Sequence, residues 1–359
     1  MPTWNDIQKE VGQRRKTLGP QALDIVRRER IARLFAHTGR PVIIYAVDFL
    51  HQSDKTRVAG RDIQIDLADK EGFIEIIRDL PAGPLDLVLH SPGGNPLATE
   101  SIISLLRSKF DNIRVFVPNV AKSAATMIAL GGDIIAMDER GELGPIDPQM
   151  VLSFDQQIVI SPAQAILDQF ERARSEVQSD PGKLPGWLPM LRQYGPSLLI
   201  EAQNAIDLSK KLVRQWLIKY MLKDKPDVET IADSITAFFG EFNNFQAHGR
   251  MVSIDDIISL GIKTLDLRKD RVLGDLVWEV YTAIGITFAS TGAYKLIENN
   301  LDQAFIKIIQ QIQVIGSPLM PQIPSGQGGI PSPSQPALPP SGLSRQQRRA
   351  AERASNKRS

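Results

Sequence analysis

The sequence predicts a fold of mixed α/β class, in which strands of a largely parallel sheet are buried beneath helices. Between residues 41 and 137, short continuous apolar runs alternate with segments of helical periodicity. Continuous apolar runs are typical of strands that are covered on both faces. Beyond about residue 150, long amphipathic segments predominate and indicate helices.

The predicted elements follow one another in a regular order. The first forty residues are charged and show apolar positions at three- and four-residue spacing, which predicts a helical segment over residues 1–40. The strands predicted after it are PVIIYAV, DIQIDL, LDLVLHS, NIRVFVP and DIIAMD. The helices predicted between them are DKEGFIEIIRDL with Asp69 as its N-cap, PLATESIISLLRSKF, and a short helix from Ser123 to Leu130.

The second half of the chain is predicted to be mainly helical. Its helical runs are SPAQAILDQFERARSEV, PSLLIEAQNAIDLSKKLVRQWLIKYML and VETIADSITAFFG. A short unit, HGRMVSIDDIISLGI, closes a main domain over residues 41–270, and two more helices form an extension over residues 271–315. Residues 316–359 combine a linker rich in Pro, Ser and Gly with a basic tail of local charge +5, and we expect no folded core there.

Composition excludes several classes of function. The chain of 359 residues has no cysteine, so it has no disulfide, thiolate nucleophile or cysteine-based metal site. A formal net charge of +1 gives no reason to expect a nucleic-acid partner, apart from a weak contact by the basic tail. P-loop, Rossmann and HExxH motifs are absent, and we expect neither a cofactor nor a metal.

The apolar runs also bear on where the protein works. No stretch reaches about 18 uninterrupted apolar residues, the length expected of a membrane span. The run LVWEVYTAIGITFASTGAY contains Glu279 and is predicted to be a packed helix. The N-terminus lacks the apolar core of a signal peptide. We therefore expect a cytoplasmic protein.

Two segments are predicted to meet at one edge of the sheet. LVLHSPGGN ends a buried strand with Gly93 and Gly94, which allow positive φ and close approach of a ligand to the backbone. Ser123 begins a helix one βα unit later, where unpaired N–H groups favour negative charge. A hydroxyl beside fixed N–H donors is what acyl transfer requires. The structural alternative is that Ser123 caps its helix and the glycines form a turn.

These segments carry a family resemblance. LVLHSPGG and VFVPNVAKSAATMIALGGDIIAMDERGELGPIDPQM resemble the serine dehydrogenase proteinase family, which is related to protease IV (signal peptide peptidase) and, more distantly, to Clp proteases and crotonases. The resemblance covers roughly residues 40–265 and includes YAVDF, IQIDLADKEGFIEIIR and SKKLVRQ in family order. It implies a Clp/crotonase-type spiral of ββα units, with Ser123 as nucleophile. Gly93 or Gly94 and the Ala124 N–H would form the oxyanion hole. It also implies a homo-oligomer that needs no cofactor.

A serine nucleophile needs a base, and histidine is the usual one. The four histidines are His37, His51, His90 and His248. His37 and His51 lie outside the motifs, and His90 is predicted to be a packed strand-end residue. His248, in AHGRMVS, resembles a His-containing segment of the family. Clp-type relatives carry their histidine where Asp147 stands in this chain.

Protease IV relatives use a lysine, which can serve when burial lowers its pKa. Lys211, in LSKKLVRQW, matches a lysine of the family motif. Lys183, in SDPGKLPG, comes at a separation from Ser123 nearer to that of the protease IV pair. Lys122 is expected to point away from the adjacent serine.

The sequence therefore predicts a serine peptidase acting on peptides or proteins, with Ser123 as nucleophile and Lys211, Lys183 or His248 as base. Two other classes stay open. One is a crotonase-type acyl-CoA enzyme, which would use the oxyanion hole without a nucleophile. The other is a catalytically silent scaffold whose linker and basic tail do the work.

Overall fold

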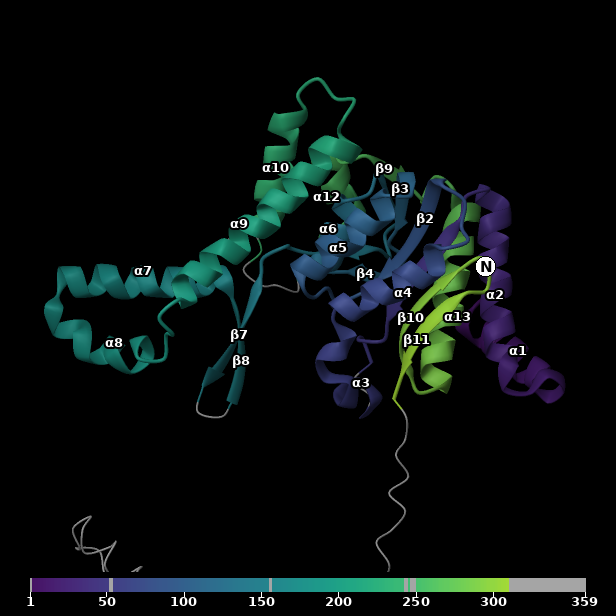
Figure 1. The fold of residues 1–359 in the computed structure, drawn as a ribbon, viewed down its shortest axis with the longest axis horizontal. Coiled ribbons are helices and arrows are strands. Elements are labelled where there is room, and N and C mark those ends of the chain that lie inside the picture. Colours follow the sequence, from purple (N-terminus) through teal and green to yellow (C-terminus); the bar gives the residue numbers. More distant parts are fainter. Residues whose placement is uncertain (1, 52–53, 155–156, 242–244, 246–249, 310–359) are drawn as a thin grey trace, which may run out of the picture. The chain divides into compact units, whose positions relative to one another are not determined.

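A computed structural model describes residues 2–51, 54–154, 157–241, 245 and 250–309 (Figure 1). Its centre is a seven-stranded sheet in the order β11-β10-β1-β2-β3-β5-β9. The strands of this sheet are β1 (Val42–Val47), β2 (Gly83–His90), β3 (Phe110–Phe116), β5 (Ile134–Met137), β9 (Thr264–Asp266), β10 (Ala293–Asn299) and β11 (Ala304–Ile308). The five strands from β1 to β9 are parallel, and β10 and β11 are antiparallel to their neighbours. The mixed α/β class predicted from the sequence is confirmed.

Helices cover both faces of the sheet (Figure 1). One face packs on α4 (Leu67–Ile77), α5 (Pro96–Arg107) and α6 (Ala124–Leu130), and the other on α2 (Ala22–Thr38) and α13 (Arg271–Ser290). Each face of the sheet has its own hydrophobic core, because successive side chains along β1 point to opposite faces. Tyr45 lies in the core beneath α4, α5 and α6, and Ile44 lies in the core beneath α2 and α13. Burial on both faces is why these strands read as continuous apolar runs.

The remaining elements surround this centre. The N-terminal helix α1 (Trp4–Leu18) packs on α2 and α13, so the predicted helical segment is present. The other helices are α3 (Asp54–Ala59), α7 (Ala163–Ser179), α8 (Leu184–Leu191), α9 (Leu198–Trp216), α10 (Val228–Gly240) and α12 (Ile254–Ser259). Two small sheets pair β4 (Val120–Ala121) with β6 (Glu142–Leu143) and β7 (Gln149–Phe154) with β8 (Gln157–Pro162). The β7–β8 hairpin occupies the start of the region predicted to be helical.

The prediction of a strand at DIQIDL is wrong. Gly60–Ile63 form a 3₁₀ turn, and helix α4 begins at Leu67 after three intervening residues. Its N-cap is Asp66 and not Asp69 as predicted, because the Asp66 carboxylate accepts the Asp69 N–H and Asp69 completes the capping box. The alternation that suggested a strand comes from a helix start whose aspartates bond to the backbone.

The prediction of two helices over residues 272–313 is correct only for α13. A β10–β11 hairpin follows it, and β10 pairs with β1 inside the sheet. The turn between its strands uses Asp302 at φ 65. This segment therefore completes the central sheet and is not a helical extension.

Helix α13 is long and apolar enough to cross a membrane by length and composition. In the fold, 67% of its most apolar window is buried. It packs against α2 and β10, as a core helix does.

Candidate active site

Ser123 stands immediately before α6, at the carboxyl edge of the sheet. Its backbone has φ 52 and ψ −123, a conformation that side-chain-bearing residues rarely adopt. Such a conformation costs about 1–3 kcal/mol and persists only where the surroundings enforce it. Its hydroxyl makes no capping bond to the helix. The interpretation of Ser123 as a helix cap therefore lacks the hydrogen bond that would justify it.

The two glycines of the SPGG turn lie directly against this serine. Gly93 has φ +95, and a Cβ added to it would be 2.7 Å from the Ser123 Cβ and 2.5 Å from the Lys122 carbonyl oxygen. Gly94 has φ +156 and lies as close to the backbone of Ile65. Only glycine allows these two contacts, so the sequence motif has a physical reason at both positions.

Ser91 connects the two loops of the site. Its N–H donates to the Val120 carbonyl at 3.0 Å, and its carbonyl accepts the Lys122 N–H at 3.1 Å. Its buried hydroxyl accepts the Gly93 N–H at 3.2 Å. One residue thus fixes the glycine turn against the segment that ends in Ser123.

Two N–H groups beside the serine remain available. Among the residues that the structure describes, no acceptor is bonded to the N–H of Gly94 or of Ala124. The Ala124 N–H is free because it opens α6, and the first N–H groups of a helix have no partner within it. Both residues line the same cavity as Ser123. The arrangement can therefore stabilise the oxyanion that develops on a carbonyl oxygen when the Ser123 oxygen adds to the carbonyl carbon.

The cavity over Ser123 has a volume of about 220 Å³ and is mainly apolar. Its apolar side chains come from α6, the 146–151 segment, β8 and α9: Met127, Ile146, Pro148, Met150, Val151, Ile160 and Ala205. Gln64, Gln149 and Ser209 add polar groups. No charged side chain of the described chain lines it. The site is thus a serine and two N–H donors at the base of an apolar pocket.

Residues 18–183 match the model of the family described as ClpP-like SDH-type serine proteinases. The match spans 166 of the 359 residues, just under half of the chain. It confirms the resemblance seen in the sequence for residues 40–183.

Other proteins are similar to parts of this chain. Two uncharacterized proteins of Methanocaldococcus jannaschii are similar: one is 37% identical over 107 residues, and the other is 29% identical over 184 residues. The matches cover 29% and 50% of this chain, and 37% and 53% of those proteins. The chain therefore spans about half, or less, of the length of the curated relatives that it matches.

Solved structures with a similar arrangement include two variants of a membrane-bound stomatin-specific protease, one of them in complex with a substrate peptide. Their TM-scores are 0.32 and 0.33 at 18% and 16% identity, covering 57% and 56% of this chain and 77% and 70% of theirs. A peptidase from Plasmodium falciparum gives 0.29 at 12% identity, covering 63% of this chain and 95% of its own. Likeness at this level transfers no residue role to this chain.

The two lysines predicted as bases lie on the surface of the protein. Lys183 ends a 3₁₀ turn (Pro181–Lys183) and is exposed, and Lys211 is exposed on α9. Neither lines the Ser123 cavity. On α9 it is Ser209 that faces the cavity, and residues two apart on a helix point about 200° apart. His248, the third candidate, lies outside the described residues, and all three assignments stay predictions.

Other residues near the motifs are engaged elsewhere. The Lys122 ammonium points away from Ser123, as expected, and donates to the Leu143 and Arg250 carbonyls at 2.9 and 3.3 Å. Asp147, which replaces the histidine of Clp-type relatives, is buried and accepts from the Gln149 amide at 3.1 Å. Neither side chain lines the Ser123 cavity.

His90 is buried behind the SPGG turn and not inside the cavity. Its ring lies between those of Phe49 and Tyr281, with both centroids 4.9 Å away, and its Nδ1 accepts the Val120 N–H at 3.3 Å. Burial lowers its pKa to about 4. A neutral, packed His90 agrees with the strand-end role predicted for it.

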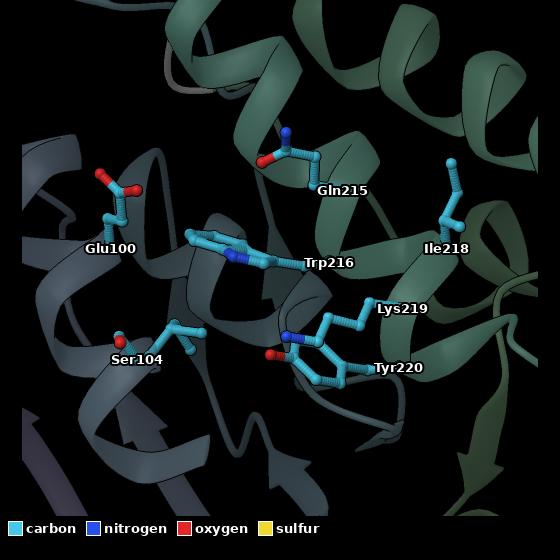
Figure 2. A pocket seen from close by; sticks show the side chains of 8 residues that line it. Glu100, Ser104, Gln215, Trp216, Ile218, Lys219 and Tyr220 are labelled. Atoms are coloured by element: carbon cyan, nitrogen blue, oxygen red, sulfur yellow. The ribbon is translucent and has the colours of Figure 1, made fainter. Parts of the chain in front are cut away.

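A second cavity, of about 440 Å³, opens between α5 and the end of α9. Figure 2 shows Glu100 and Ser104 of α5 on one side and residues 215–220 on the other, with the Trp216 ring reaching toward α5. None of its lining residues borders the Ser123 cavity. It is separate from the site. Within the described residues, no group of three or more His, Cys, Asp or Glu side chains is placed to hold a metal.

The sequence analysis did not identify three parts of the chain that contribute to the site. Ser91 stands in the SPGG motif, and a serine directly before that turn is the signal that could have identified it. Ser209 lies on the apolar stripe of α9, where a small polar residue is a weak signal. The Gln64–Ile65 segment was hidden by its misassignment to a strand.

Proposed function

We propose that the protein is a serine endopeptidase in which Ser123 is the nucleophile and the N–H groups of Gly94 and Ala124 form the oxyanion hole. Gly93 supports the hole through its close approach to Ser123, because its own N–H is bonded to Ser91. The observation that carries the proposal is the strained backbone of Ser123, which lines one apolar cavity together with Gly94 and Ala124, whose N–H groups have no acceptor among the described residues.

In the proposed reaction the Ser123 oxygen attacks a peptide carbonyl while a base takes the hydroxyl proton. The negative charge that develops on the carbonyl oxygen is stabilised by the two N–H donors, each worth roughly 3–4 kcal/mol in the transition state. The proton then passes to the leaving amine as the C–N bond breaks. Water attacks the resulting ester with help from the same base, and Ser123 is regenerated.

The cavity supports a substrate that presents an uncharged side chain. Its walls are mostly apolar, and no charged group of the described chain is there to pair with a charged side chain. An unpaired charge in such a pocket would lose its hydration without compensation. We therefore propose that peptides with a medium-sized apolar residue before the cleaved bond are preferred.

The base is proposed to be Lys211, Lys183 or His248. Both lysines belong to the part of the chain that contributes Ala205 and Ser209 to the cavity wall. His248 is followed by Arg250 and Val252, and Val252 pairs with Leu143 next to the cavity. Replacing each of the three in turn decides among them.

A homo-oligomer is part of the proposal. Several large apolar side chains are strongly exposed on the hairpin and on α9: Ile158 is 67% exposed, Ile160 58% and Ile200 66%. Contiguous exposed apolar surface typically marks a contact with another protein. We further propose a cytoplasmic setting, because a chain without cysteine suits a reducing compartment.

One observation favours a second candidate function, that of a silent scaffold. No His, Lys, Asp or Glu among the described residues lines the Ser123 cavity. A serine without a base is a poor nucleophile at neutral pH. A scaffold would retain the fold and the glycine turn without hydrolysing peptides.

Labelling the full-length protein with a fluorophosphonate probe distinguishes the two. Peptidase function predicts one label per chain, located on Ser123 by peptide mass spectrometry and absent from Ser123→Ala. Absence of label from folded wild-type protein would contradict the peptidase and support the scaffold. Ser209→Ala, which removes the other serine hydroxyl that lines the cavity, controls for misassignment and should still be labelled.

A further inference from the structure

A buried ion pair lies behind the glycine turn and is formed by a residue far away in sequence. Lys295, on β10, is fully buried and donates to both oxygens of Asp69 at 2.9 and 2.8 Å. Asp69 is itself fully buried and also accepts the Tyr45 hydroxyl at 2.7 Å. Buried charges of this kind are retained only when they are paired and hydrogen-bonded.

The third proton of the Lys295 ammonium goes to the backbone. It donates to the Gln64 carbonyl oxygen at 2.7 Å. Gln64 lines the Ser123 cavity. The ion pair is therefore connected directly to the segment that borders the site.

That segment clamps Gly94 from both sides. The Ile65 N–H donates to the Gly93 carbonyl at 2.8 Å, and the Ile65 carbonyl accepts the Asn95 N–H at 2.9 Å. A Cβ on Gly94 would be 2.3 Å from the Ile65 nitrogen. The orientation of the Gly94 peptide thus depends on where the Gln64–Ile65 backbone lies.

A second series of contacts leads from the Lys295–Asp69 ion pair to Gly93 in the SPGG turn. Tyr45, bonded to Asp69, also lies near the Ser91 side chain, which lowers the pKa of Tyr45 and partly offsets the larger upward shift. The Ser91 hydroxyl accepts the Gly93 N–H. Burial, followed by the charge of Asp69, raises the pKa of Tyr45 well above its ordinary value, so it remains a hydroxyl donor. Both routes converge on Gly93 and Gly94.

We propose that Lys295 is a positioning residue that, through Gln64 and Ile65, holds the Gly94 N–H toward the oxyanion beside Ser123. The inference rests on the proposed peptidase function. The effect is expected on stabilisation of the transition state and not on substrate binding, because Lys295 touches neither Ser123 nor the cavity. Loss of its bond to Gln64 would displace a donor without removing the nucleophile or the apolar pocket.

Lys307 provides a matched control. It lies on β11 and contacts the same carboxylates, Asp69 at 3.0 Å and Asp66 at 3.1 Å. Within the described chain it makes no hydrogen bond to Gln64 or Ile65. Lys307→Met therefore removes one charge from the cluster, as Lys295→Met does, but leaves the route to the glycine turn intact.

The experiment measures the kinetics of fluorophosphonate labelling at Ser123 in the full-length chain. For Lys295→Met we expect the maximal labelling rate to fall about 10- to 100-fold, since loss of one oxyanion donor typically costs 10²- to 10³-fold and a displaced donor costs less. The probe concentration at half-maximal rate should change less than twofold. Lys307→Met should keep both parameters within about twofold of wild type.

Folding is controlled with a second variant. If Lys295→Met does not fold, the charge-balanced pair Lys295→Met with Asp69→Asn leaves no buried unpaired carboxylate and should show the same fall in rate. Equal labelling rates in wild type and in a folded Lys295 variant would overturn the positioning role. An equal fall in the Lys307 variant would also overturn it, because charge balance would then explain the effect. Absence of label from wild type would overturn the peptidase and this inference together.

Discussion

The two sides of the Ser123 cavity are built in different ways. The sheet side, residues 90–124, is backbone: Ser91, Gly93 and Ser123 are fixed by short bonds and by contacts that only glycine permits. The helical side, from residue 163 to residue 216, contributes small side chains such as Ser209 and has its lysines on the surface. In the proposed reaction the transition-state charge is therefore stabilised by backbone groups fixed in the fold, whereas Lys183 and Lys211, the lysines proposed as bases, are exposed.

The largest effect is expected on the sheet side. Ser123→Ala should reduce hydrolysis of a fluorogenic peptide with an apolar residue before the cleaved bond by at least about 10⁴-fold, since loss of a nucleophile costs up to about 10⁶-fold. Initial rates at saturating peptide are the measurement. Far-UV circular dichroism should match wild type, because the alanine removes only the hydroxyl. Retention of more than a tenth of the activity would exclude Ser123 as nucleophile.

The helical side is tested by replacing each candidate base. One of Lys211→Met, Lys183→Met and His248→Gln should lower kcat by about 10²- to 10⁴-fold, the usual contribution of a general base. Lys210→Met is the matched control for Lys211, because Lys210 is its neighbour on α9 and the aliphatic part of Lys210 packs beside Gly240 of α10. Unchanged kcat in all three variants would mean that this chain's predicted bases are wrong.

A single methyl group at the glycine turn tests how closely the sheet side is fitted. Gly93→Ala should lower kcat by about 10²- to 10³-fold, because its Cβ would displace Ser123 or the oxyanion donors. It should also destabilise the fold by about 2–4 kcal/mol.

Gly83→Ala is the control for Gly93→Ala. Gly83 also has positive φ, at +115, but its added Cβ meets nothing within 4 Å. Thermal unfolding should show about 1–2 kcal/mol of destabilisation from strain alone, with kcat unchanged. If both variants keep wild-type kcat, the close approach of Gly93 has no catalytic consequence.

The smallest effect on catalysis is expected at His90, which lies on the sheet side but behind the turn. Its pKa is about 4 in the folded protein because of burial, compared with 6.5 for an ordinary histidine. Between these values the unfolded chain binds the extra proton, so stability is complete above about pH 6.5 and is lost as pH falls toward 4. The loss attributable to His90 is on the order of 3 kcal/mol.

Urea unfolding at pH 7, 5.5 and 4 measures this dependence. His90→Gln should flatten the decline between pH 6.5 and pH 4 and change kcat at pH 7 less than about threefold. A decline as steep as in wild type would show that His90 is not the group responsible. A large fall in kcat would make His90 a candidate base again.

The sequence predicted what depends on local pattern and missed what depends on distant partners. The strands β1, β2, β3 and β5 read correctly because continuous apolar runs follow from burial on both faces. Strand β10 was predicted to be a helix because Lys295 and Glu298 interrupt its apolar run. Both charged side chains are fully buried in the fold. Their partners, Asp69 and Arg27, come from the first third of the chain, and no local pattern reveals such a pairing.

The site shows the same division. Gly93, Gly94 and Ser123 were identifiable because their roles depend on backbone conformation, which small residues at a strand end signal. The surface position of Lys183 and Lys211 was not identifiable, since a family motif gives a residue's place in the chain and not its exposure. The clamp formed by Gln64 and Ile65 needed the tertiary structure.

The most direct test of the fixed sheet side is the structure of the protein after reaction with a small fluorophosphonate. We predict a phosphonyl group on the Ser123 oxygen, with its phosphoryl oxygen within about 2.7–3.1 Å of the Gly94 and Ala124 nitrogens. A phosphoryl oxygen directed away from both nitrogens, or an adduct on another residue, would contradict an oxyanion hole built from these two N–H groups.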